Sequence, residues 1–156
     1  HKKLLYISGM PESYVATARM EAIKQFAKDY NMELTMRNGD FVEKVAREIT
    51  LKEGAEHDMI VCASDLMAIG AMRALIDMDI FRPVCGFDGI SLMGYVGQQM
   101  NTVKQDFRKI AQTAVQELKH LLDGGEGRAV LLDHELVRLE YSDVIRYSNR
   151  DGMLKK

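Results

Sequence analysis

Short apolar runs alternate along the chain with longer stretches of helical periodicity, and this alternation restricts the fold more than any other feature. Runs such as Leu4–Ile7 and residues 59–63 have the length and continuous apolar character of buried strands. The stretch 107–122 carries its apolar residues on one helical stripe, and the stretch 66–77 is apolar almost all round. Strands separated by helices predict an α/β fold with a mostly parallel sheet and helices on both faces.

The other expected elements follow the same pattern. Strands are also expected at residues 33–36, 84–87, 101–103 and 130–137, and a helix over residues 42–54. A helix over residues 14–30 is expected to bury one apolar face built from residues at steps of four, namely Tyr14, Ala18, Ala22, Phe26 and Tyr30. The 156 residues suit one domain, so we expect a single lobe over residues 1–138 and a C-terminal tail over residues 139–156.

Composition argues against several functions. The net charge is −2, and Lys and Arg are scattered among Asp and Glu, unlike the basic stripe of a free-standing DNA-binding domain. No apolar run approaches the roughly 20 residues of a membrane span, and the N-terminus lacks a signal-peptide pattern. The four His residues, with Cys62 and Cys85, have no metal-site spacing. We therefore expect no membrane partner, no metal and no cofactor.

Polar and aromatic residues follow several of the expected strands. In open α/β sheets, ligands bind beyond the carboxyl ends of the strands. Carboxylates and a guanidinium can bridge neighbouring sugar hydroxyls, while an aromatic face covers the C–H side of the ring. A sugar site is therefore predicted among the residues at these strand ends, which are Met10, Tyr14, Arg19, Asp40, Phe41, Ser64, Asp65 and Asp88.

Three stretches carry a family resemblance. They are IVCASDLMAIGAMRAL (Ile60–Leu75), VCGFDGI (Val84–Ile90) and MNTVKQDFRKIAQTAVQEL (Met100–Leu118). A weaker match surrounds Arg19 and the Gly39-Asp40-Phe41 turn. In this order, they resemble the effector-binding region of LacI/GalR-type transcription repressors over most of residues 3–138. The resemblance implies a periplasmic-binding-protein-like, Rossmann-like lobe that senses a ligand and has no catalytic activity.

The resemblance also implies roles for individual residues. A sugar or sugar phosphate would be bound by Arg19, Phe41, Ser64, Asp88, Gln105 and Phe107. Ser64 stands where many members place an Asn, which implies a different ligand preference. Ser64 and Asp65 together form an N-cap signal for the helix that follows, and Asp65 is expected to cap that helix and not to bind ligand. Asp106 is expected to be structural. A homodimer would form through Ala71, Met72, Leu75 and Leu92.

The family's effector region has two lobes that hold ligand between them, and residue 3 resembles the start of the second lobe. The first lobe and the DNA-binding headpiece are therefore expected to lie outside this chain, with DNA contacted only through that headpiece. The helix over residues 107–122 packs on the first lobe in the family. A cytoplasmic location is implied, and one wall of the cleft alone is expected to bind ligand weakly or not at all.

Several other classes were weighed against the repressor. Asp40, Asp65 and Asp88 could supply the acid and base of a glycosidase, but no nucleophile–base pair accompanies them. The glycine-rich stretch 124–127 lacks the Lys-Ser/Thr of a phosphate-binding loop, so an enzyme is not expected. A receiver domain would need an acidic cluster after the first strand, where Ser8 and Gly9 stand. A lobe of a periplasmic sugar-binding protein and an engineered single-lobe protein remain as alternatives.

Overall fold

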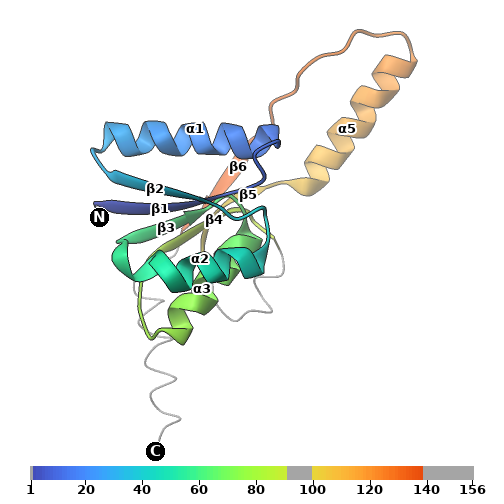
Figure 1. The fold of residues 1–156 in the computed structure, drawn as a ribbon. Helices are drawn as coiled ribbons and strands as arrows, with labels where there is room; N and C mark the ends of the chain where they lie inside the picture. Colours follow the sequence, from blue (N-terminus) through green and yellow to red (C-terminus); the bar gives the residue numbers. More distant parts are fainter. Residues whose placement is uncertain (1, 91–99, 139–156) are drawn as a thin grey trace, which may run out of the picture.

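A computed structural model describes residues 2–90 and 100–138 (Figure 1). These residues form a six-stranded sheet in the order β2-β1-β3-β4-β5-β6, in which only the β5–β6 pair is antiparallel. The elements along the chain are β1 (Lys3–Ser8), α1 (Tyr14–Asp29), β2 (Glu33–Asn38), α2 (Glu43–Glu53), the 3-10 helix η1 (Gly54–Glu56), β3 (Met59–Cys62), α3 (Asp65–Asp77), β4 (Val84–Asp88), β5 (Asn101–Gln105), α5 (Phe107–Leu122) and β6 (His134–Val137).

Helices cover both faces of the sheet, as expected: α1 lies on one face and α2 with α3 on the other (Figure 1). The chain leaves β1 toward β2 on one side and returns across the sheet to β3 and β4 on the other. Right-handed crossovers in opposite directions place their helices on opposite faces. The reversal also creates a switch point beside the carboxyl end of β1, where ligands bind in folds of this type.

The core lies mainly between the sheet and the α2–α3 layer. The β1 run Leu4–Ile7 is fully buried because it lies between β2 and β3 and is covered on both faces. Helix α3 is buried on several sides, as its all-round apolar sequence predicts, and it packs on both α2 and the sheet. This layer holds the strand ends in fixed positions, which is what a ligand site requires.

The buried face of α1 differs from the expected one. Ala16 and Ala27 are buried, whereas Tyr14 is 86% exposed and Phe26 and Tyr30 also face solvent. A step of four residues overshoots one helical turn by about 40°, so four such steps rotate a series by about 160° around the helix. The predicted series therefore could not remain on one face. The face that meets the core instead carries Ala16 and Ala27, with Met20 and Ile23 partly buried between them.

The last strand is shorter than expected. It begins at His134, whereas residues 130–133 form no strand. The reason is its partner: β5 ends at Gln105, which pairs with His134. Residues 130–133 thus have no strand beside them, and β propensity alone does not supply one.

Helix α5 begins and ends at the expected residues but buries none of its side chains in the described chain. It projects away from the sheet, and the segment after it returns to β6 (Figure 1). Its apolar stripe is exposed, with Val115 and Leu118 67% and 57% accessible. A stripe of this kind normally contacts another surface.

No helix in residues 2–90 and 100–138 is long and apolar enough to span a membrane. Within the same residues, no group of three His, Cys, Asp or Glu side chains has the arrangement of a metal site.

Candidate effector-binding site

Three polar side chains from separate elements meet at the carboxyl ends of β3, β4 and β5. Arg19, from α1, donates one hydrogen bond to the carbonyl oxygen of Ala63 and a second, at 3.2 Å, to Oδ1 of Asp88. Gln105, at the end of β5, donates to the same Asp88 oxygen at 2.9 Å. All three side chains were predicted to bind ligand, and the fold brings them into one cluster.

The guanidinium of Arg19 lies over the face of an aromatic ring. Its central carbon is 3.7 Å from the centroid of Phe87, the residue before Asp88 on β4. The contact with Phe87 and the two hydrogen bonds hold the Arg19 side chain in place before a ligand arrives. Ligand binding therefore costs less side-chain conformational entropy. Phe87 was not predicted as a site residue, although the Gly-Phe-Asp motif at a strand end was a usable signal.

Asp88 has a strained backbone. Its φ of 119° lies in a region that L-residues seldom adopt, and Gly89 follows with φ of 71°. Such strain persists where the surroundings enforce it, which is common at binding sites. Both side-chain donors use Oδ1, and among the described residues no side chain or backbone amide donates to Oδ2. That oxygen remains able to accept a hydrogen bond from a ligand hydroxyl.

The electrostatics of the cluster combine burial with a counter-charge. Burial raises the pKa of Asp88, and the positive charge of Arg19 opposes that rise. The hydroxyl of Tyr6, on β1, is buried without a hydrogen-bond partner among the described residues. Burial raises the pKa of Tyr6 to about 12, and Arg19 opposes this shift too. A tyrosine within an otherwise apolar buried run was a sequence signal for this position.

The other residues predicted to bind ligand lie outside the hydrogen-bonded cluster. Phe41, with φ of 60°, covers Gly9 so closely that a Cβ there would lie 2.0 Å from its ring. Phe107 is 51% exposed at the start of α5. Ser64 is buried, and its hydroxyl accepts a hydrogen bond from the Met67 amide at 3.3 Å, which makes it the N-cap of α3.

The capping role expected of Asp65 was therefore wrong, because Ser64 performs it. Asp65 is the first residue of the helix, and its carboxylate bonds elsewhere, to Thr102 and Ile90. The structural role expected of Asp106 is confirmed: it caps α5 by accepting a hydrogen bond from the Lys109 amide at 2.9 Å.

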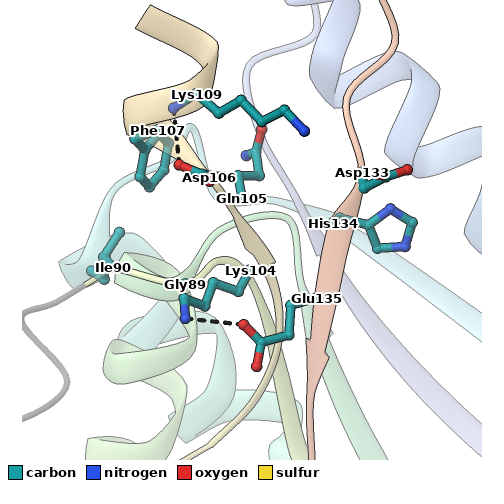
Figure 2. Close-up of a pocket in the computed structure, with 10 residues that line it drawn as sticks. All are labelled: Gly89, Ile90, Lys104, Gln105, Asp106, Phe107, Lys109, Asp133, His134 and Glu135. Atoms are coloured by element: carbon teal, nitrogen blue, oxygen red, sulfur yellow. Dashed lines mark hydrogen bonds and ion pairs between the residues drawn. The ribbon is translucent and has the colours of Figure 1, made fainter. Parts of the chain in front are cut away.

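A depression of about 700 Å³ lies beside the cluster, at the ends of β4, β5 and β6. Figure 2 shows Gln105 and Phe107 on its rim, together with the Lys104–Glu135 ion pair that joins β5 to β6 at 3.0 Å. Arg19 and Asp88 are not among its lining residues. The side chains of Arg19 and Asp88 are 15% and 23% exposed, so the cluster is mostly buried and keeps limited surface for a ligand.

The predicted dimer residues lie in different environments. Ala71 and Leu75 are 0% and 4% exposed inside the chain's own core, so little of either is left to contact a second chain. Met72 is partly buried and keeps some surface. Leu92 lies outside the described residues.

Comparisons with known proteins agree on one family. The model for the periplasmic binding protein-like domain matches residues 1–138. The HTH-type transcriptional regulator MalR of Clostridium butyricum is 36% identical over 114 residues, covering 70% of this chain and 32% of the relative. The lactose operon repressor of Escherichia coli K12 is 29% identical over 136 residues, covering 80% of this chain and 37% of the relative. The chain thus spans less than half the length of these relatives.

Solved structures show the same similarity. A dimeric Lac repressor with a C-terminal deletion matches with a TM-score of 0.81 and 26% identity, over 88% of this chain and 54% of the other. A LacI family transcriptional regulator from Arthrobacter sp. FB24, in complex with lactose, matches with a TM-score of 0.76 and 25% identity, over 88% and 56%. The chain belongs to the periplasmic binding protein-like domain family, and it corresponds to the effector-binding region of LacI-type transcription regulators.

Proposed function

We propose that this chain supplies one wall of a sugar-effector cleft in a cytoplasmic transcription regulator and performs no catalysis. The observation that carries the proposal is the Arg19–Asp88–Gln105 cluster at the strand ends. It presents a guanidinium, a carboxylate and an amide, which together can donate to and accept from adjacent sugar hydroxyls. Phe41 and Phe107 stand at the same end of the sheet and supply apolar faces for the sugar ring.

The second wall would be a further lobe outside the described residues. Helix α5 supports that inference, because its exposed apolar stripe has no partner in the described residues. Docking of a first lobe on this stripe would bury it and place the second wall above Asp88. Sugar that binds the closed arrangement more tightly than the open one would shift the balance between them, and a DNA-binding headpiece would respond.

A homodimer is the proposed assembly, with α3 at the interface. Leu66, Met72, Arg73 and Ile76 keep exposed surface along one side of this helix. They replace Ala71 and Leu75 as the side chains through which a second copy would pack. Sedimentation velocity over a range of concentrations tests this assembly, and a monomer at every concentration would exclude it.

The sugar site is tested by NMR titration of the chain with lactose, maltose and glucose 6-phosphate, because NMR detects the weak binding expected of a single wall. The expected result is a set of shifts confined to the backbone and side chains around Asp88 and Gln105 for at least one sugar. The Asp88→Asn variant should lose them. Shifts scattered over other surfaces, or tight saturation by the single lobe, would contradict the proposal.

A further inference from the structure

Asp65 is a fully buried carboxylate whose two oxygens bind two different segments. Oδ1 accepts the hydroxyl hydrogen of Thr102, on β5, at 2.6 Å, and Oδ2 accepts the backbone N–H of Ile90 at 2.8 Å. Ser64 already caps the helix, so these bonds are not part of helix capping. Each oxygen of this buried carboxylate thus has a hydrogen-bond donor, and these two bonds offset part of the cost of burying it.

The position of Asp65 requires a glycine on the neighbouring strand. A Cβ on Gly86, in β4, would lie 2.2 Å from Oδ1 of Asp65 and 3.1 Å from its Cα. Only a residue without a side chain lets the start of α3 approach β4 this closely. The carboxylate can therefore reach past β4 to Thr102 on the next strand. A single side chain links α3, β5 and the segment after β4.

The segment held by Asp65 contains the strained residue of the candidate site. Asp88 lies between Gly86, against which Asp65 packs, and Ile90, whose amide Asp65 binds. Pairing with β5 holds Asp88 on its strand, opposite Lys104. The strand ends at Asp88 with positive φ, and Gly89, also with positive φ, leads the chain to Ile90. The bond to Ile90 closes this turn, so the unusual φ of Asp88 is enforced from both sides.

We propose that Asp65 is a positioning residue for effector binding. It holds the turn from Asp88 to Ile90 so that the Asp88 carboxylate stays within reach of Arg19 and Gln105. The predicted effect of Asp65 on sugar affinity rests on the proposed function. The predicted effect of Asp65 on the conformation of the turn does not depend on it. The competing interpretation is that Asp65 is a buried polar group that stabilises the core and has no particular influence on Asp88.

Three variants separate these interpretations. Thr102→Val removes the donor to one oxygen of Asp65 and leaves the bond to Ile90, so it is the control for lost core stability. Asp65→Ala removes both bonds. Asp65→Asn is the milder change and serves if the alanine variant does not fold. Its side-chain carbonyl oxygen can accept from the Ile90 amide while its side-chain amide donates to the Thr102 hydroxyl.

The first readout needs no ligand. Amide hydrogen exchange at Ile90 and the side-chain amide resonances of Gln105 are measured by NMR and compared with global stability from urea unfolding. In Asp65→Ala, exchange at Ile90 should accelerate by about tenfold or more beyond the change in global stability, because a bond to a charged acceptor is lost. The Gln105 resonances should move at the same time. In Thr102→Val, both should remain near wild type after the same correction.

The charge-neutral variant gives an intermediate result. Asp65→Asn should accelerate exchange at Ile90 by a smaller factor than the alanine variant. It should also lower the pKa of Asp88, since burial and the negative charge of Asp65 both raise that pKa while Arg19 lowers it. Unchanged exchange at Ile90 in both Asp65 variants, or exchange that only follows global stability in all three, would overturn the proposal.

The second readout is sugar binding, with the same NMR titration of lactose, maltose and glucose 6-phosphate. Affinity should fall in the Asp65 variants and hold in Thr102→Val, although all three lose stability. An equal loss in Thr102→Val would refute a positioning role. Absence of binding by the wild-type chain would count against the proposed function, while exchange at Ile90 would still decide whether Asp65 controls the turn.

Discussion

Helices α3 and α5 are both apolar along much of their surface, yet they have opposite environments in this chain. Met67, Ala68 and Ala71 of α3 are fully buried between α2 and the sheet, whereas α5 buries no residue against the part of the chain that the structure describes. The α3 sequence is apolar on several sides, and α5 has one sharp stripe. The difference teaches that α3 belongs to the lobe's own core, whereas the exposed stripe of α5 is the surface on which we propose that a further lobe docks.

The largest expected effect tests the core side of this comparison. Met67→Ala should lower the free energy of unfolding by about 2–5 kcal/mol, because it leaves a cavity where a fully buried side chain stood. Leu118→Ala on α5 is the matched change and should cost within about 0.5 kcal/mol. Urea unfolding followed by circular dichroism measures both. Similar losses for the two variants would show that α5 is packed in the chain as firmly as α3.

The two N-caps allow the same comparison with a smaller change. Ser64→Ala should lower the global free energy of unfolding by about 1 kcal/mol, since it removes the cap of a helix packed in the core. Asp106→Ala removes the cap of α5 and should accelerate amide exchange in the first turns of that helix, with the global transition unchanged. A global loss in Asp106→Ala would place α5 within the cooperative unit. Unchanged stability in Ser64→Ala would show that the cap contributes little, and it would favour the ligand-binding role predicted for Ser64 from the sequence.

Asp88 lies where the two regions join, and its titration gives a smaller effect. Burial raises its pKa in the fold above the usual value of 3.8, against the influence of Arg19. The folded chain then binds the proton more tightly than the unfolded chain, so this carboxyl's contribution to stability falls as pH rises from below 3.8 through the raised folded pKa. Asp88→Asn should remove that fall. The test is the unfolding free energy of the wild type minus that of the variant, measured across this pH range. This value should fall as pH rises, and a value that rises with pH would contradict the prediction.

The smallest effect on folding is expected at the exposed stripe of α5. Leu118→Glu should change the free energy of unfolding by less than about 0.5 kcal/mol, because the side chain is 57% exposed. The same variant in a protein that also carries the first lobe should weaken contact between the lobes, since it places a charge in an apolar interface. Limited proteolysis of the α5 segment in that longer protein measures the contact. Equal protection of variant and wild type would leave the stripe without the proposed partner.

Local sequence patterns predicted most elements because they depend on local chemistry. The bounds of α5 follow from an apolar stripe that begins just after the capping residue Asp106 and ends before a glycine pair. Arg19 and Asp88 were selected because strand ends collect ligand-binding groups, and the cluster confirms that they lie together. The approach of Gln105 to Asp88 followed from family resemblance and not from spacing, since 17 residues separate the two in the chain.

By itself, the sequence determined the alternation of strands and helices, the α/β class, the family and the two charged anchors of the candidate site. Tertiary structure alone decided which face of α1 meets the sheet, which of Ser64 and Asp65 caps α3, and that Ala71 lies inside the core. It also decided that the Asp65 carboxylate binds Thr102 and Ile90. The physical reason is that hydrophobic periodicity and capping preferences act over a few residues. The partner of a buried carboxylate or a helix face is set by whichever distant strand packs against it.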